Sequence, residues 1–223
     1  MCGRYTNTAG PEELNDRFRV PIPFSEGTHR YNVAPTEQVL AIVAPKGEPE
    51  ACLLRWGLVP HWAKDPKAGA RMINARAETL AKRSAYRSLL AKNRCLILAD
   101  GFYEWRLDPD GKKRPVRYAL DDGSPFGFAG LWTSWRDPES GESMRTCTII
   151  TTAANSLVAP VHDRMPVILP RRVEDEWLDR DVPPVAALEL LRPYPSEQMT
   201  GADASMLVNS VKNDDLRLFD PAQ

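Results

Sequence analysis

Short apolar runs recur through the middle of the chain and constrain its fold more than any other feature of the sequence. The main runs are six to eight residues long, rich in β-branched or aromatic residues, and separated by glycine, proline and aspartate, which is the pattern of β-strands. The predicted strands are 39–44, 51–56, 94–99, 101–107, 114–120, 126–132 and 144–151, with a last one near 205–208. Many short strands with a few marginal helices predict an α+β fold built on a strongly curved, barrel-like and mostly antiparallel β-sheet.

Helical patterns flank these strands. The predicted helices are 11–19, a segment that follows residue 79 and ends near 92, and two acidic segments near 171–179 and 185–192. The first begins with proline and carries acidic residues in its first turn, as helix N-termini do. Between helix and strand, residues 20–36 are rich in proline and turn formers and are predicted to be a functional loop.

The length and composition of the chain fit one compact domain. We expect a single domain over residues 1–223, with the last few residues frayed, because 223 residues of which 43% are hydrophobic can form one substantial core. No apolar run approaches the roughly 20 residues needed to cross a bilayer, and no signal-peptide pattern is present. We therefore expect a cytoplasmic, nucleoid-associated monomer without a membrane partner.

The charge of the chain is unevenly distributed although the net charge is only −1. Residues 55–117 hold 15 lysines and arginines against 6 acidic residues, a local charge of +9, so the rest of the chain carries −10. A segment this basic suits a polyanion such as nucleic acid, and the alternative is a solvated face balanced by the acidic C-terminal third.

The cysteine and histidine content argues against a metal site. The four cysteines have no C-x-x-C spacing and only three histidines accompany them, so we expect no zinc, and in a reducing compartment no disulfide framework. The glycine patterns of phosphate-binding and dinucleotide-binding loops are missing, so we expect no nucleotide cofactor and no other cofactor.

The first six residues, MCGRYT, carry the most distinctive chemistry. Removal of Met1 would leave Cys2 with an α-amine and a thiol, whose reference pKa values of roughly 8 and 8.5 leave both partly reactive near neutral pH. An amine beside a thiol condenses with an aldehyde and closes to a five-membered thiazolidine. The alternative is an incidental cysteine on a frayed terminus.

Three further polar residues stand in segments otherwise built of apolar or turn residues. Asn74 follows two apolar residues, Glu104 lies in the strand GFYEW, and His162 opens the segment HDRMP. A carboxylate among aromatic residues has a raised proton affinity, which suits a general acid or base. Each also has an ordinary interpretation: a turn residue, a solvent-facing carboxylate and a structural histidine, respectively.

Six motifs in this order resemble the SOS response-associated peptidase (SRAP) family: MCGRYT, YNVAPT, WGLVPHW, INARAET, GFYEW and HDRMP. The resemblance spans the chain from Cys2 to the segment VNS at 208–210. It implies a protein that traps abasic sites in single-stranded DNA. The amine of Cys2 would form a Schiff base with the sugar aldehyde, and the thiol would close a stable thiazolidine crosslink.

The resemblance also implies roles for individual residues. Asn74 would hold Cys2 and the sugar in register, Glu104 would shuttle protons, and His162 would act on the ring oxygen or hydroxyl. β-Elimination of the DNA strand and autocatalytic removal of Met1 would accompany the trap. The DNA-binding residues it implies are Arg4, Asn32, Trp62, Arg76, Trp105 and Arg164, with core packing as the alternative for both tryptophans.

Two other functions use the same residues differently. One is an N-terminal-nucleophile amidohydrolase or protease in which the Cys2 thiol attacks amide carbonyls. The other is a single-stranded DNA-binding module without catalysis, in which Cys2 is idle. Only a trap requires both a covalent DNA adduct and a basic groove.

Overall fold

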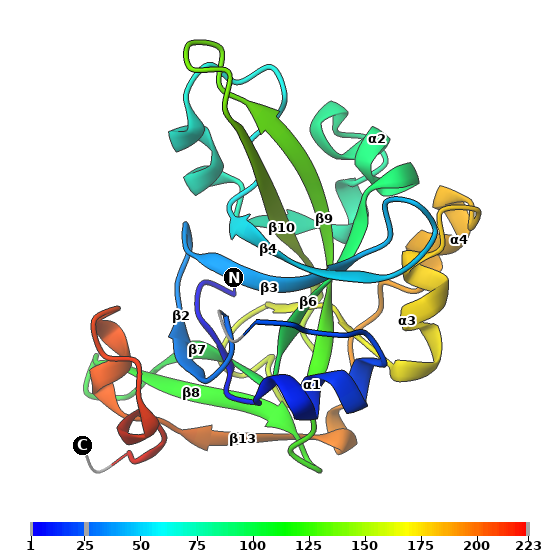
Figure 1. Ribbon diagram of the computed structural model, residues 1–223. Coiled ribbons are helices and arrows are strands. Elements are labelled where there is room, and N and C mark those ends of the chain that lie inside the picture. Colours follow the sequence, from blue (N-terminus) through cyan, green and yellow to red (C-terminus); the bar gives the residue numbers. More distant parts are fainter. Residues whose placement is uncertain (1, 25–26, 222–223) are drawn as a thin grey trace.

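The computed structural model describes residues 2–24 and 27–221, and a closed barrel of strands lies at its centre (Figure 1). The barrel strands are β3 (Gln38–Val43), β4 (Glu50–Trp56), β6 (Arg94–Ala99), β9 (Phe126–Arg136) and β10 (Ser143–Ala153). They pair in the order β10-β4-β3-β6-β9, and β9 pairs again with β10 to close the ring. The pairings of this ring are antiparallel except for the parallel one between β4 and β10.

Three short strands extend the barrel wall. β5 (Asn74–Arg76) and β11 (Arg164–Pro166) pair with β10, and β12 (Ile168–Leu169) pairs with β9. Because β5 begins at Asn74 and β11 begins two residues after His162, these pairings bring two of the predicted catalytic segments to one strand of the barrel.

A second, fully antiparallel sheet packs beside the barrel and carries the N-terminus (Figure 1). Its strands, in spatial order, are β13 (Met199–Asp203), β8 (Lys113–Leu120), β7 (Gly101–Leu107), β1 (Tyr5–Asn7) and β2 (Arg30–Val33). The chain passes from the barrel into this sheet at Asp100, between β6 and β7. The buried Asp100 carboxylate accepts hydrogen bonds from Thr6 and Thr8, and so fixes β1 at the junction.

Strand β6 shows why the barrel forms. All six of its residues are buried, because successive side chains point alternately into two apolar layers. Cys95 and Ile97 join the cluster inside the barrel, whereas Leu96 and Leu98 join the cluster beneath the helices. A strand covered on both faces reads as a continuous apolar run, which is the pattern of residues 94–99.

Helices lie at the margins of the barrel (Figure 1). The α-helices are α1 (Pro11–Phe18), α2 (Ser84–Lys92), α3 (Arg171–Leu178) and α4 (Pro184–Glu189), and the 3-10 helices are η1 (Pro66–Arg71), η2 (Ala77–Thr79), η3 (Ser196–Gln198), η4 (Met206–Asn209) and η5 (Leu216–Phe219). Trp177 of α3 is fully buried and donates its indole N–H to the carbonyl of Cys95, which ties α3 to β6. Within the described residues, none of the helices has the length and apolar character needed to cross a membrane.

The segment 205–219, here called the C-terminal strap, folds back over the second sheet (Figure 1). The Asp214 carboxylate accepts from the backbone N–H groups of Tyr31 and Asn32 and pairs with Arg30. The ring of Phe219 packs against Tyr31, at 5.3 Å between ring centroids. The strap therefore holds β2 from a position about 180 residues later in the chain.

The predicted fold class, α+β with a barrel-like and mostly antiparallel sheet and peripheral helices, is confirmed. Two local predictions are wrong. Residues 30–33, predicted as loop, form β2. The strand predicted near 205–208 is not formed; the 3-10 helix η4 (Met206–Asn209) stands there, because the Ser205 side chain caps it by accepting from the N–H of Leu207. The predicted fraying of the last residues falls partly on 222–223, which lie outside the described residues.

Candidate active site

Cys2 lies in the core rather than on a loose terminus. Its side chain is 0% exposed and belongs to the apolar cluster inside the barrel. Burial, reinforced by the Glu104 carboxylate, raises the pKa of the Cys2 thiol well above its usual range. The thiol is therefore held protonated at neutral pH. Met1, whose removal the sequence predicts, lies outside the described residues.

Asn74 fixes the backbone of Cys2. Its side-chain nitrogen donates a hydrogen bond of 2.7 Å to the Cys2 carbonyl oxygen. Asn74 opens β5 and lies opposite Ile149 of β10, so the barrel wall sets the position of this amide. The Asn74 Oδ1 atom is buried and has no hydrogen-bond partner among the described residues, which leaves an acceptor beside Cys2.

Glu104 is buried at the inner end of a cavity. Its side chain is 4% exposed, on β7 opposite Val116. Burial raises the pKa of Glu104, and the nearby His162 partly offsets the rise. A carboxyl group with a raised pKa exchanges protons nearer to neutral pH than an exposed one, as a general acid or base must.

His162 lies across the same cavity on the loop before β11. Its Nδ1 atom accepts a hydrogen bond of 2.9 Å from the backbone N–H of Arg164. The Asp163 carboxylate also lies 3.0 Å from Nδ1, an ion pair only if the ring is protonated. Asp163 is largely exposed, and because Nδ1 accepts the backbone N–H of Arg164, the hydrogen of the neutral ring lies on Nε2.

The cavity has a volume of about 580 Å³. It is lined by Gly3, Arg4, Glu104, Trp105, Lys113, His162 and Asn209. The structure thus gathers Glu104 and His162 around one hollow, directly beside the Cys2–Asn74 pair. Lys113 and Asn209 were not singled out from the sequence, because a lone lysine or asparagine carries no pattern of its own.

The predicted DNA-binding arginines differ in whether their guanidinium groups are already bound to other protein groups. Arg4 donates from Nη1 to Asn32 Oδ1 and to the Val208 carbonyl, each at 2.7 Å, and burial lowers its pKa. Arg164 makes two bonds, of 2.7 and 2.9 Å, to the carboxylate of Glu78. Arg76 is exposed and, among the described residues, its guanidinium group makes no hydrogen bond or ion pair.

Asn32 is fully buried, so the structure does not present it to a nucleic acid backbone. Its side-chain nitrogen donates to the carbonyls of Val208, Ser210 and Asn213, and its oxygen accepts from Arg4. Because each of these contacts links β2 with the strap or with Arg4, Asn32 acts here as a support for Arg4. Direct contact with DNA, as predicted for this residue, does not fit its burial.

The two tryptophans differ in their surroundings. Trp105 is partly buried on the cavity wall and donates its indole N–H to Asn209 Oδ1 at 2.8 Å. Trp62 is 54% exposed, meets the His61 ring edge-on, and does not line the cavity. Trp62 is therefore not a core residue, and its large exposed face is free for a partner.

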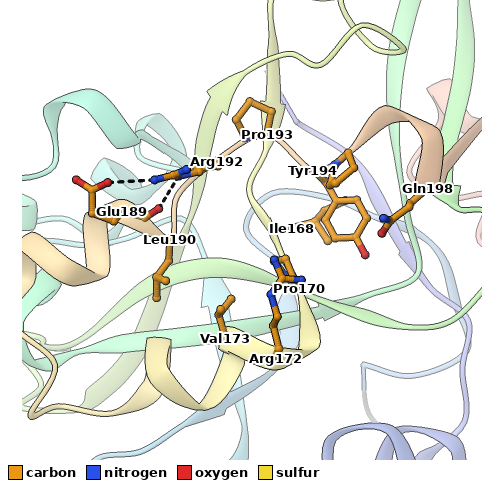
Figure 2. A pocket seen from close by; sticks show the side chains of 11 residues that line it. Ile168, Pro170, Arg172, Val173, Glu189, Leu190, Arg192, Pro193, Tyr194 and Gln198 are labelled. Atoms are coloured by element: carbon orange, nitrogen blue, oxygen red, sulfur yellow. Dashed lines mark hydrogen bonds and ion pairs between the residues drawn. The ribbon is translucent and has the colours of Figure 1, made fainter.

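A second cavity, of about 430 Å³, lies beside α3 and the segment that follows α4 (Figure 2). Arg172, Arg192 and Tyr194 are among its lining residues, and Arg192 is paired with Glu189. None of the residues predicted to be catalytic lines this cavity. In the described part of the chain, no group of three or more histidine, cysteine, aspartate or glutamate residues is placed to hold a metal ion.

Comparisons with known proteins find similar chains that cover nearly the whole length of this one. The Bacillus subtilis (strain 168) protein named abasic site processing protein YoqW is 44% identical over 224 residues, covering 99% of both chains. The Gallus gallus protein named abasic site processing protein HMCES is 33% identical over 256 residues, covering 96% of this chain and 76% of its own. A crystal structure of a Bacteroides thetaiotaomicron protein superposes with a TM-score of 0.88 at 26% identity, covering 100% of both chains.

The family-level comparison spans most of the chain. The sequence profile described as SOS response associated peptidase (SRAP) matches residues 1–211, which include Cys2, Asn74, Glu104 and His162. With this match, and with relatives of more than 40% identity over nearly the whole length, the chain belongs to the SRAP family.

Proposed function

We propose that this protein processes abasic sites in single-stranded DNA by forming a covalent thiazolidine with Cys2. The observation that carries the proposal is the hydrogen bond between Asn74 and the Cys2 carbonyl, which holds the second residue of the chain at a cavity lined by Glu104 and His162. The relatives named abasic site processing protein support the same substrate.

The reaction begins when hydrolysis of the Met1–Cys2 bond frees the α-amine of Cys2. The amine nitrogen adds to C1′ of the ring-opened sugar, and loss of water gives a Schiff base. The thiol sulfur then adds to the same carbon while its proton passes to the nitrogen, closing the thiazolidine. C1′ stays at the oxidation level of an aldehyde in the Schiff base and in the thiazolidine, so no redox partner is required.

The buried groups suit this order of steps. A protonated Cys2 thiol is a weak nucleophile, so the amine attacks first and the thiol closes the ring afterwards. Glu104, whose pKa is raised, takes and returns the protons of the addition and dehydration steps. His162, with Nε2–H in its neutral form, donates to the sugar ring oxygen or hydroxyl and favours ring opening.

Two side activities follow from the same intermediates. A Schiff base at C1′ acidifies the C2′ protons, so their removal allows β-elimination of the 3′ phosphate, an AP lyase reaction. Glu104 is also placed to activate water for the autoproteolytic release of Met1. We expect the protein to act as a monomer in the cytoplasm, associated with the nucleoid when bound to DNA.

The rival amidohydrolase needs a thiolate, and burial of Cys2 disfavours the thiolate. The decisive experiment is a denaturing gel with the mature protein and a single-stranded oligonucleotide carrying one abasic site. Wild-type protein should give a slow-migrating covalent species, and intact mass should show loss of Met1 and addition of the DNA minus water. Cys2→Ala should give no stable species.

Cys2→Ser separates the amine from the thiol. With the amine retained, this variant should be trapped on DNA by borohydride reduction of the Schiff base, yet form far less heat-stable adduct without reductant. If wild-type protein binds the oligonucleotide but no covalent species forms, the non-catalytic binding module becomes the better interpretation.

A further inference from the structure

The cavity that Glu104 and His162 line also carries two unassigned polar groups, Lys113 and Asn209. The β7–β8 ladder pairs Trp105 with Pro115 and Leu107 with Lys113. Lys113 is therefore the diagonal neighbour of Trp105 on one face of the ladder. Both residues line the same cavity.

The ammonium group of Lys113 is free to bind a ligand. Lys113 is exposed, and no hydrogen bond or ion pair to it occurs among the described residues. Glu104 is the buried acidic residue of this hairpin and lines the same cavity, whereas the acidic residues of the β7–β8 turn and of β13 are paired with arginines. Those pairs are Arg106 with Asp108 and Asp203, and Arg114 with Asp108 and Asp110.

Asn209 is oriented by Trp105. The indole N–H can only donate, so Asn209 must present Oδ1 to it, and the side-chain NH₂ group then points elsewhere with two donors unused. No bond from Asn209 Nδ2 is made to any described residue. A cation and a doubly donating amide thus line the same cavity as the Trp105 ring.

We infer that Lys113 and Asn209 form a phosphate-binding subsite for the nucleotide whose base packs on Trp105. Single-stranded DNA is commonly held by an aromatic platform for the base with cationic groups along the backbone. Arg4 and Arg164 are less able to supply this contact, because both already hydrogen-bond to protein groups. The inference rests on the proposed DNA substrate, and it adds a contact to a phosphate of the DNA backbone next to the cavity.

The test measures non-covalent binding in the Cys2→Ala background, so that crosslinking does not contribute. The probe is a fluorescein-labelled oligothymidylate without an abasic site, titrated by fluorescence anisotropy over a series of salt concentrations. Lys113→Ala should weaken binding severalfold and lower the slope of log K against log salt by about 0.7, the value for one lost phosphate contact on a single strand. Lys113→Arg should restore both.

Lys112→Ala is the matched control. It removes the same charge one residue earlier in the same hairpin, and Lys112 does not line the cavity. Its slope should equal that of the parent protein. Equal slopes for Lys113→Ala and Lys112→Ala would overturn the inference and assign both lysines to general surface charge.

Asn209→Asp tests the second group. Aspartate keeps an oxygen acceptor for the Trp105 indole but replaces the two amide donors with a negative charge. Weaker binding supports a phosphate contact, whereas unchanged binding reduces Asn209 to a support for Trp105 and contradicts its place in the subsite. If wild-type protein forms the covalent adduct but Lys113→Ala leaves the salt slope unchanged, only the phosphate-binding subsite is wrong. If Lys113→Ala lowers the salt slope but wild-type protein forms no adduct, only the proposed covalent trapping of abasic sites is wrong.

Discussion

The side-chain amide of Asn74 donates a 2.7 Å hydrogen bond to the Cys2 carbonyl oxygen across 72 positions of sequence. Because β5 is paired to β10, the barrel wall determines where the N-terminal residue lies. The proposed nucleophile is thereby held in place before substrate binds, and a group held in this way loses less entropy on the way to a transition state.

Asn74→Ala should slow formation of the covalent adduct by roughly two- to tenfold, the kinetic equivalent of a hydrogen bond worth about 0.5–1.5 kcal/mol. The measurement is single-turnover crosslinking followed on denaturing gels, with thermal unfolding as the control for folding. A variant with native unfolding temperature and native crosslinking rate would show that the bond does not position Cys2.

Glu104→Gln should make the protein more stable at pH 7 while abolishing most crosslinking. Burial raises the pKa of Glu104 in the folded state. The favourable contribution of the protonated carboxyl group to folding is therefore fully present below the unfolded pKa of about 4.3, and it is lost as the pH rises through the folded-state pKa. Urea unfolding at a series of pH values should therefore show an advantage of Glu104→Gln at pH 7 that disappears below about pH 4. An advantage independent of pH would point to packing instead.

Asp100→Ala should destabilise the fold by about 3 kcal/mol, the usual cost of removing one partner of a buried charged pair. Its carboxylate accepts from Thr6, Thr8 and Arg117, so the loss falls on the junction between β1 and the barrel. For a chain of this size the unfolding temperature should fall by about 6–12 °C. Asp110→Ala, which breaks an exposed pair with Arg114, should stay within about 1 kcal/mol of wild type.

Arg76→Ala should weaken binding of single-stranded DNA and make it less sensitive to salt. Arg76 shares one face of β5 with Asn74, two residues away, and its guanidinium is exposed and unpaired among the described residues. Loss of one phosphate contact should lower the salt slope by about 0.7. Lys46→Ala, on the turn between β3 and β4, serves as a remote control and should leave the slope unchanged.

Strand positions were predicted well where burial leaves a local pattern. Residues 94–99 are covered on both faces and therefore read as an unbroken apolar run that coincides with β6. β2 was missed because its polar residues gain their partners from Asp214 in the strap, a contact that no local pattern reveals. Met206–Asn209 was misassigned because its apolar residues suit a strand, whereas the Ser205 cap selects a 3-10 helix.

The sequence predicted which residues could carry the chemistry of the candidate site, but not which charged side chains are buried or paired. Cys2, Asn74, Glu104 and His162 were named from the sequence; in the structure Asn74 hydrogen-bonds to Cys2, and Glu104 and His162 line one cavity together with Gly3. Whether Glu104 was buried could not be decided from strand alternation, since its neighbour Trp105 also lines the cavity. The pairing of Arg164 with Glu78 depends on tertiary contacts 86 residues apart and was not visible in the sequence.

The contact from Arg4 to the Val208 carbonyl spans 204 positions. Arg4 is synthesised long before the strap that holds it. During translation the Arg4 side chain therefore gains its hydrogen bond to the Val208 carbonyl only after the strap has left the ribosome, so this part of the cavity wall is completed late.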